Sequence, residues 1–191
     1  MSLSDGMTLY HGSYAPVEDI DLKKCSTGKD FGKGFYLTSD EDQARRFIRT
    51  SLLKAQSLGQ VDAGQRSGYV SAFRFRTPAT SLSVFEFPTA DEHWLRFVSL
   101  NRRSALAVKL RDKVDPGLTC ADVIIGKVAN DTTNPVITTY LNGLYGPLDD
   151  PKSASTAIGL LLPDRLKDQF CFATQRAVAC LEPMKVTRYE L

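Results

Sequence analysis

The sequence predicts a single domain of the α+β class. Its 191 residues are enough for one domain with a hydrophobic core. Apolar residues make up 42% of the chain and charged residues 24%, which is the balance of an ordinary globular protein. Patterns typical of strands and of helices follow one another without strict alternation, which favours α+β over a doubly wound parallel sheet. Residues 1–6 are polar and are expected to be a leader or tag, so the domain is expected to span residues 7–191.

The first half of the chain contains the elements that carry the most specific motifs. Residues 8–13 and 34–38 are short, largely apolar runs beside glycine, and they predict two strands. A helix is predicted from Ser39 to Ala55, because Ser39 can cap it, acidic residues occupy the first turn and apolar residues recur on one face. Alternating aromatic and basic residues over 69–76 predict a strand with one face in water.

Capping signals and apolar runs define the remaining elements. Thr89 and Glu92 have the spacing of a capping box, which predicts a helix running to about Arg102. The pair Asn134–Pro135 is expected to begin another helix, because proline is favoured at the first helical position. The other predicted elements are strands at 81–87, 122–126, 169–173 and 184–191, and helices at 153–162 and from Thr174 to about Leu181.

The composition argues against several classes of protein. A net charge of +2 gives no electrostatic signature of nucleic-acid binding. No apolar run approaches the ~20 residues needed to cross a bilayer, and no signal peptide is evident. The four cysteines lack C-x-x-C spacing and the chain has two histidines, so no metal site is expected. Cys171 and Cys180 lie in apolar surroundings and are expected to be core thiols, which favours a reducing, cytoplasmic location.

Three short strings carry the most specific information. Residues 9–13 read Leu-Tyr-His-Gly-Ser, and residues 30–38 read Asp-Phe-Gly-Lys-Gly-Phe-Tyr-Leu-Thr. Glycine beside a polar or aromatic side chain indicates that something approaches the backbone closely. The third string, Asp-Gln-Phe-Cys-Phe, lies far downstream at residues 168–172.

Together these strings resemble the NAD-binding motifs of the ADP-ribosyltransferase fold. The resemblance implies a split β-sandwich of two small sheets flanked by helices, with NAD as the substrate and no metal. It places His11 on a ribose hydroxyl, the backbone of Gly12 on the nicotinamide amide and the ring of Tyr36 against the nicotinamide. Gln169 takes the third position, normally Glu and sometimes Gln, which bonds the nicotinamide ribose beside the bond that breaks.

The wider sequence resembles a bacterial family of unknown function that is thought to have this fold. The strings that carry this resemblance are residues 30–36, 94–98, 125–131 and 168–172, so it extends over nearly the whole chain. It implies three catalytic residues, His11, Tyr36 and Gln169. The residues expected to bind NAD lie in the first two strings or directly after a buried strand: His11, Gly12, Ser13, Asp30, Phe31, Gly34, Phe35, Tyr36, Thr38, Asn130 and Asp131.

These residue types suit the cleavage of NAD. Breaking the nicotinamide–ribose bond develops positive charge on the sugar, so acceptors or negative groups beside it favour the reaction. The ring of Tyr36 orients the flat leaving group, while His11 and Ser13 can bond the riboses. Gln169 can orient a sugar hydroxyl but supplies no charge, so glutamate at this position is expected to match or raise NAD cleavage. Asp168 is adjacent, but on a strand it points to the opposite face.

The same residues also allow simpler interpretations. A Tyr-His pair in a strand is commonly a hydrogen-bonded core pair. Asp30 is expected to accept backbone hydrogens in the glycine turn. Asn130 and Asp131 can cap a turn instead of meeting a ligand. Arg102 is expected on the solvated surface or, alternatively, against the pyrophosphate of NAD.

The leading hypothesis is transfer of ADP-ribose from NAD to an unidentified acceptor, or hydrolysis of NAD. The first alternative is a catalytically inactive module that binds NAD or another nucleotide, which the neutral Gln169 favours. The second is a toxin-like interaction protein that is held by a neutralising partner protein. Neither a membrane nor a nucleic acid is expected as a partner. The loops that would select the acceptor show no decisive chemistry.

Overall fold

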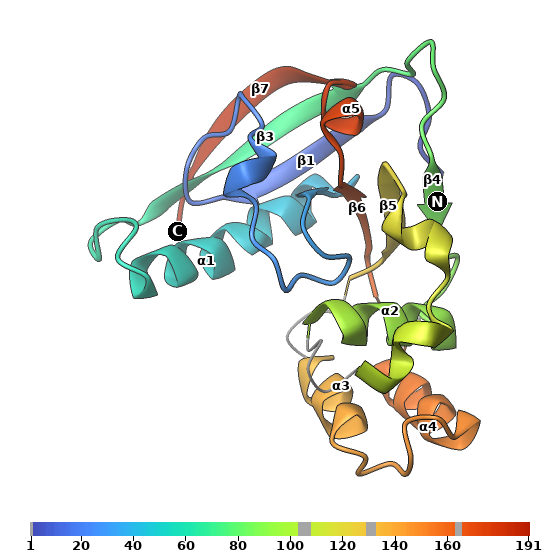
Figure 1. Ribbon diagram of the computed structural model, residues 1–191. Helices are drawn as coiled ribbons and strands as arrows, with labels where there is room; N and C mark the ends of the chain where they lie inside the picture. The colour runs from blue at the N-terminus through green and yellow to red at the C-terminus, as the bar shows by residue number, and fades with distance from the viewer. Residues whose placement is uncertain (1, 103–107, 129–132, 163–165) are drawn as a thin grey trace.

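The computed structural model describes residues 2–102, 108–128, 133–162 and 166–191, and within them the fold is mixed α+β (Figure 1). The strands form a three-stranded sheet, β1-β3-β7, and a four-stranded sheet, β2-β6-β5-β4. The strands are β1 (Thr8–Ser13), β2 (Phe35–Leu37), β3 (Ser67–Phe75), β4 (Val84–Glu86), β5 (Val123–Lys127), β6 (Asp168–Phe172) and β7 (Leu181–Glu190). The α-helices are α1 (Glu41–Ser57), α2 (Glu92–Arg102), α3 (Asn134–Leu141), α4 (Pro151–Leu161) and α5 (Gln175–Val178), and the 3-10 helices are η1 (Leu22–Lys24), η2 (Val108–Lys113) and η3 (Pro116–Thr119).

The two sheets meet where β1 passes β2. The strands of the first sheet are all antiparallel, and in the second sheet only the pairing of β4 with β5 is parallel. Tyr10 and Thr38 form an isolated antiparallel bridge between the sheets. The Tyr10 N–H donates to the Thr38 carbonyl oxygen at 2.7 Å, and the Thr38 N–H donates to the Tyr10 carbonyl oxygen at 3.0 Å. This bridge brings the first two sequence motifs side by side.

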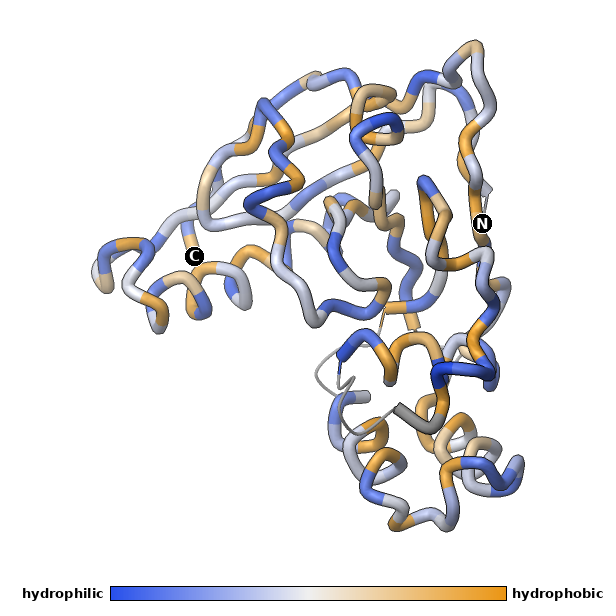
Figure 2. The backbone as a smooth tube through the Cα atoms, in the orientation of Figure 1, coloured by the Kyte–Doolittle hydropathy of each residue, from blue (hydrophilic) through white to orange (hydrophobic). Residues whose placement is uncertain are grey.

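One hydrophobic core fills the space between the sheets. Phe170 and Phe172 on β6 are fully buried there, together with Leu9 of β1 and Phe73 of β3. Because side chains alternate along a strand, the intervening residues of β6 face the other way. The apolar run of β5 is visible as a hydrophobic segment in Figure 2. The core therefore fixes which residues of β6 are presented on the opposite face.

Helix α1 covers the outer face of the three-stranded sheet (Figure 1). A Cβ atom on Gly12 would lie 1.9 Å from the carbonyl oxygen of Ala44, and one on Gly68 would lie 2.1 Å from a methyl group of Ile48. The absence of side chains at these two glycines thus allows α1 to pack closely against the sheet. Val70 of β3 is buried beneath α1, and Tyr10 of the neighbouring strand β1 is partly buried there. This face of the sheet is therefore less exposed to water than the sequence predicts.

Helices α2, α3 and α4 form a layer at the other end of the molecule (Figure 1). Trp94 of α2 is fully buried in a second core, and its indole N–H donates to the Lys127 carbonyl oxygen at 2.9 Å. Cys171 of β6 belongs to this second core, so the core lies on the face of the four-stranded sheet opposite the phenylalanines.

Several predicted boundaries are wrong by a few residues because a different side chain caps the element. Asp40 rather than Ser39 caps α1, since its carboxylate accepts from the Gln43 N–H at 3.0 Å. Asp91 rather than Thr89 accepts from the first turn of α2, bonding the Trp94 N–H at 2.9 Å. Further differences include a shorter β4, α4 beginning at Pro151, α5 ending at Val178 and β7 beginning at Leu181, and β2, β3, β5 and β6 differ by one or two residues at their ends.

The cysteines are free thiols in this structure. Cys171 and Cys180 are buried, which confirms their assignment to the core. Within the described ranges no helix is long and apolar enough to cross a membrane. In the same residues no group of three or more histidine, cysteine or acidic side chains is arranged to hold a metal ion.

Candidate functional site

His11 is held in one tautomer by the second motif. Its Nδ1 lies 2.8 Å from the Tyr36 carbonyl oxygen, and its ring lies 4.6 Å from that of Phe35, centre to centre. A carbonyl oxygen only accepts, so Nδ1 carries the proton and Nε2 of the neutral ring is left as an acceptor. Burial lowers the pKa of His11 and the charge of Lys29 lowers it further, so the neutral ring prevails at pH 7. His11 is therefore suited to accept a hydrogen bond from a hydroxyl.

Tyr36 is fixed by the loop that precedes it. Its hydroxyl donates to the Gly32 carbonyl oxygen at 2.8 Å and accepts from the Phe31 N–H at 3.0 Å. Burial, followed by the neighbouring Cys171, raises the pKa of Tyr36, so the phenol stays protonated. Burial raises the pKa of the Cys171 thiol to about 12, which makes it a poor nucleophile. Tyr36 thus offers a ring in a fixed orientation rather than an ionisable group.

The backbone of Gly12 points to the edge of β1 next to β2. Tyr10 directs its N–H and C=O to Thr38, and alternate residues of a strand share an edge. Gly12 follows two residues later, so its N–H and C=O point to the same edge, just past the bridge. No partner for either group is seen on that edge among the described residues. A donor and an acceptor from one residue match a primary amide, which has the complementary pair.

Gln169 lies on the face of β6 that alternation with the two phenylalanines predicts. It shares that face with Cys171, and the two phenylalanines point the other way into the core. Its Nε2 donates to Asp30 Oδ2 at 2.8 Å and to the Lys127 carbonyl oxygen at 3.3 Å. Gln169 is only 8% exposed. The loop that contains Asp30 therefore covers much of this side chain.

The carboxylate of Asp30 has different hydrogen-bond donors from those expected. The sequence predicts that its carboxylate bonds the glycine turn, whereas the carboxylate accepts from Arg102 Nε at 2.6 Å and from Gln169 Nε2. The Asp30 side chain is 7% exposed and that of Arg102 is 20% exposed. The expectation that Arg102 lies on the solvated surface is therefore wrong, because it pairs with a buried carboxylate. Its contact with the pyrophosphate of NAD stays a prediction. Asn101 adds a hydrogen bond to the backbone oxygen of Asp30 at 3.2 Å.

The other predicted residues of the first two motifs have clear packing roles. Phe31 and Phe35 are buried in the two separate cores. A Cβ atom on Gly34 would lie 2.4 Å from the Cys171 sulfur, so glycine allows the loop to approach β6. The Thr38 hydroxyl donates to Gln43 Oε1 at 2.9 Å and accepts from the Asp40 N–H, which supports the start of α1. Their contacts with NAD stay a prediction.

Of the remaining candidates, Ser13 lies within the described residues, and Asn130 and Asp131 do not. Ser13 is buried at the end of β1, where its hydroxyl lies 3.5 Å from the Ala15 nitrogen. The structure brings together His11 and Tyr36 directly, and Tyr36 is paired across the sheet with Cys171, two residues from Gln169. The three predicted catalytic residues are thus positioned by β1, β2 and β6.

Sequence reasoning missed Lys29 and the pairing role of Arg102. Lys29 is half-buried, and burial lowers its pKa, with the charge of Lys54 lowering it further and that of Asp30 raising it. Its ammonium nitrogen lies 5.9 Å from the centre of the Phe47 ring. No local pattern distinguishes Lys29 from other loop lysines, and Arg102 lies in the last turn of α2, where a basic residue has an ordinary explanation.

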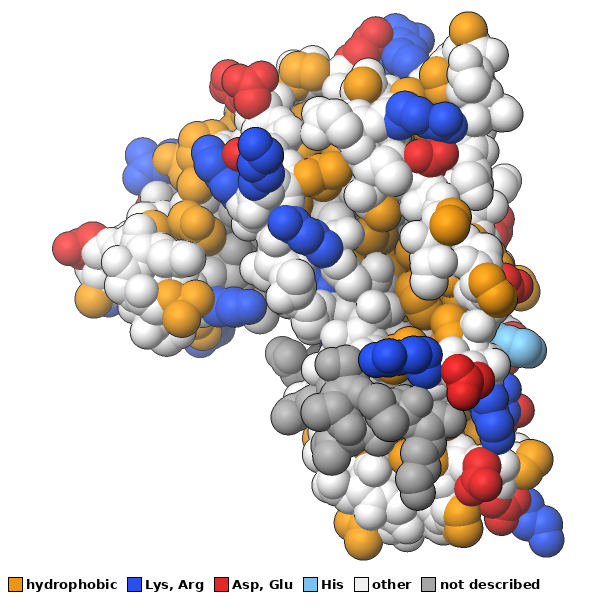
Figure 3. Space-filling model, viewed as in Figure 1, with side chains coloured by type: hydrophobic (Ala, Val, Ile, Leu, Met, Phe, Trp, Pro, Cys, Tyr) orange, Lys and Arg blue, Asp and Glu red, His pale blue; other side chains and the backbone are white. Residues whose placement is uncertain are grey.

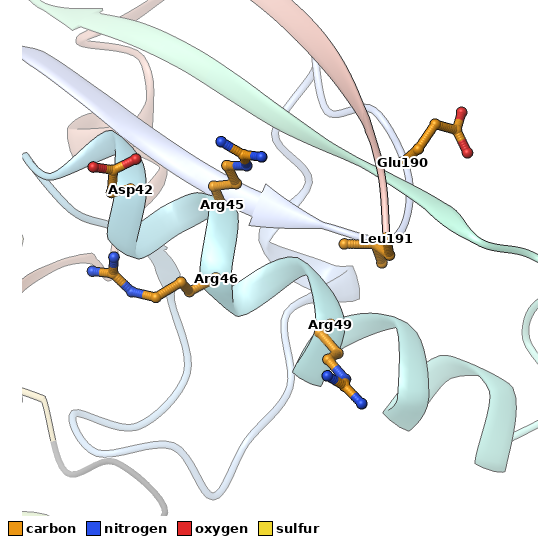
Figure 4. Close-up of a pocket in the computed structure, with 6 residues that line it drawn as sticks. All are labelled: Asp42, Arg45, Arg46, Arg49, Glu190 and Leu191. Atoms are coloured by element: carbon orange, nitrogen blue, oxygen red, sulfur yellow. The ribbon is translucent and has the colours of Figure 1, made fainter.

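Two surface hollows are found outside the three predicted catalytic residues. One, of about 450 Å³, is open and lies between α1 and the end of β7; Figure 4 shows its lining of Asp42, Arg45, Arg46, Arg49, Glu190 and Leu191. The other, of about 330 Å³, is lined by Phe31, Phe97 and Ile124 with a rim that includes Lys33 and Cys120. His11, Tyr36 and Gln169 line neither. In Figure 3 the surface is hollowed between the part that contains α1 and the layer of α2, α3 and α4, and charges of both signs are interspersed.

Comparison with known proteins places the chain in a family without assigning it a role. No curated protein and no solved structure matched the chain. The family described as "Protein of unknown function (DUF3990)" matches residues 7–182, which is most of the chain. The chain therefore belongs to the DUF3990 family of proteins of unknown function.

Proposed function

We propose that this protein binds NAD where β1 meets β2 and transfers its ADP-ribose to an unidentified acceptor or to water. In this proposal the two sheets form an ADP-ribosyltransferase-like split β-sandwich. His11 accepts a hydrogen bond from a ribose hydroxyl, the backbone of Gly12 bonds the nicotinamide amide, and Tyr36 stacks on the nicotinamide ring. Gln169 orients the hydroxyl of the nicotinamide ribose.

The observation that carries the proposal is the junction of the two sheets. The bridge between Tyr10 and Thr38 places an acceptor nitrogen, a fixed aromatic ring and the backbone edge of Gly12 next to one another. Nicotinamide riboside presents hydroxyls, a flat ring and a primary amide, which are the groups that these three features complement. The first and second motifs together supply this set.

The proposed reaction is a substitution at the anomeric carbon of the nicotinamide ribose. The bond between C1′ and the pyridine nitrogen breaks, and its electron pair leaves with neutral nicotinamide. An oxygen or nitrogen of the acceptor, or a water oxygen, then forms a bond to C1′ and releases a proton to solvent. The enzyme stabilises the positive charge that develops on the sugar through acceptor groups already in place.

The test combines binding with product analysis. Calorimetry measures the affinity for NAD, and chromatography measures free nicotinamide and ADP-ribose after incubation. Labelled NAD with a cell extract then reveals whether the label passes to protein, to nucleic acid or to a small molecule. Loss of both binding and nicotinamide release in a His11→Ala protein that still folds cooperatively supports the site. A folded wild-type protein that neither binds nor cleaves NAD refutes the proposal.

A second candidate function is a binding module that retains NAD without cleaving it. The observation that favours it is the environment of Gln169, whose neutral amide is 8% exposed and already bonded to Asp30. Saturable binding of NAD with no nicotinamide release over many hours would favour this module. A neutralising partner protein also stays a prediction, and co-purification from the native host would test it.

A further inference from the structure

The carboxylate of Asp30 contacts the amide of Gln169 in a buried cluster. Its Oδ2 accepts from Gln169 Nε2 at 2.8 Å, and its Oδ1 accepts from Arg102 Nε at 2.6 Å. Asp30 and Gln169 are separated by 139 positions in the sequence, so this contact is a product of the tertiary fold. The cluster lies on the face of β6 opposite the phenylalanine core.

Two acceptors fix the orientation of the Gln169 amide. The Asp30 carboxylate and the Lys127 carbonyl oxygen, 3.3 Å away, both face Nε2. An ionised carboxylate and a carbonyl have no hydrogen to donate, so the NH₂ end of the amide must face them. The amide oxygen therefore points away from Asp30, and no hydrogen bond to it is seen within the described ranges. The oxygen is left to accept a hydrogen bond from a ligand hydroxyl.

We propose that Asp30 is the positioning residue of the site: it turns the Gln169 oxygen toward the nicotinamide ribose and supplies the negative charge that a neutral glutamine lacks. This inference rests on the proposed function. A carboxylate in a buried, water-poor site acts on a nearby developing cation more strongly than one in solvent does. Arg102 offsets part of that charge and holds the carboxylate in place, as the second oxygen faces Gln169.

The contact also changes what a glutamate at position 169 is expected to do. Gln169→Glu would place a second carboxylate where Nε2 now meets Asp30, and two buried carboxylates in contact repel each other. The expectation from sequence alone, that glutamate matches or raises cleavage, is therefore reversed for the single variant. The double variant, Asp30→Asn with Gln169→Glu, is different, because the amide introduced at position 30 can donate to the new carboxylate. For this double variant we still expect glutamate at position 169 to support NAD cleavage.

The experiment measures nicotinamide release, NAD affinity and thermal unfolding for the wild type, Asp30→Asn, Gln169→Glu and the double variant. Asp30→Asn should lower kcat about tenfold or more while KM stays within about twofold, because the variant loses the negative charge and places an NH₂ donor against the Gln169 amide, which no longer holds its oxygen toward the ligand. Gln169→Glu should unfold at a lower temperature than the wild type. The double variant should have a higher kcat than Asp30→Asn, because it restores a carboxylate to the cluster. It should unfold at a higher temperature than Gln169→Glu, because that carboxylate has no like-charged neighbour.

Asp168→Asn is the matched control. Asp168 precedes Gln169, lies on the opposite side of β6 and pairs with Lys127 at 3.1 Å. It should keep the wild-type kcat. An unchanged kcat in Asp30→Asn overturns the inference, as does an equal loss in Asp168→Asn or a double variant no faster than Asp30→Asn. A wild type that releases no nicotinamide refutes turnover itself and with it the role of Asp30, whereas an active wild type matched by Asp30→Asn refutes only that role.

Discussion

The imidazole of His11 joins one sheet to the other by donating from Nδ1 to the backbone oxygen of Tyr36, 2.8 Å away. The contact links β1 and β2 one residue beyond the bridge between Tyr10 and Thr38. Since the partner is a carbonyl oxygen, the contact also decides which nitrogen of the ring faces outward as an acceptor. The role of His11 thus depends on its charge state, and this leads to a pH dependence.

Protonation of His11 should weaken both NAD binding and the fold. Burial lowers its pKa below the ordinary value near 6.5, so the folded protein favours the neutral ring. The stability that this group contributes is present above pH 6.5 and is lost as the pH falls through the folded pKa. We expect NAD affinity to be constant above the ordinary pKa of about 6.5 and to fall as the pH drops through the lower pKa of the folded protein, because protonated Nε2 no longer accepts. Calorimetry across this range measures it.

His11→Gln is the control for that pH dependence. A glutamine side chain can still bond a hydroxyl but has no ionisation in this range, so its NAD affinity should lack the fall at low pH. His11→Ala should lose most of the binding. A wild-type profile that His11→Gln reproduces would assign the ionisation to another group. Nicotinamide release that follows a single ionisation in the wild type and vanishes in both variants would indicate a general base instead.

Two substitutions at Tyr36 should separate its ring from its hydroxyl. Tyr36→Phe removes the hydrogen bonds to Gly32 and Phe31, which should cost about 1–2 kcal/mol of stability but leave NAD affinity nearly unchanged. Tyr36→Ala also removes the ring and should weaken NAD binding by about 1–2 kcal/mol. Denaturant unfolding and calorimetry measure the two effects. Equal NAD affinity in Tyr36→Ala and the wild type would remove Tyr36 from the site.

Gly12→Ala should strongly destabilise the protein. The new methyl group would lie 1.9 Å from the Ala44 carbonyl oxygen, so α1 must move away from the sheet. Gly159→Ala is the matched control, because Gly159 is an exposed helical glycine with nothing near its Cβ position. That variant should gain up to about 1 kcal/mol from helix propensity. Thermal unfolding of both variants tests the contrast, and a Gly12→Ala protein as stable as the wild type would contradict this packing.

Elements with strong local patterns were predictable from sequence. The residues 8–13 strand is confirmed as β1, and the start of α3 at Asn134 is confirmed because proline at a first helical position is a local signal. Boundaries were less predictable where several polar residues compete to cap one helix. Ser39 and Asp40 are both good caps by residue type, so the local sequence does not distinguish them, and in the structure Asp40 is the cap.

The candidate site was predictable only in part, for a related reason. The face of β6 that carries Gln169 follows from alternation with two phenylalanines, and the structure confirms it. The partners of Asp30 do not follow from any local pattern, because Gln169 and Arg102 come from distant segments. The glycine-rich turn predicts backbone donors for Asp30, whereas in the folded protein its carboxylate accepts from the side chains of Arg102 and Gln169.

Asp122 should stabilise the fold at neutral pH and lose that effect in acid. Its carboxylate accepts from the Thr174 hydroxyl at 2.6 Å, the Ser83 N–H at 2.9 Å and Arg176 at 2.9 Å. The Thr174 hydrogen bond is the largest cause that lowers the pKa of Asp122 below its ordinary value. Arg176 is 55% exposed, so solvent screens its charge and the two neutral donors should contribute most.

The sign of the effect follows from the depressed pKa. The stabilisation is present above the unfolded pKa, near 3.9, and is lost as the pH falls through the folded pKa. Asp122→Asn should lower the free energy of unfolding by about 1–3 kcal/mol at pH 7, and the gap from the wild type should narrow below about pH 4. Asp19→Asn, at an exposed loop position, should stay within about 0.5 kcal/mol of the wild type at both pH values. Urea unfolding at pH 7 and pH 3 measures all three proteins, and a gap that does not change with pH would contradict an ionised, hydrogen-bonded Asp122.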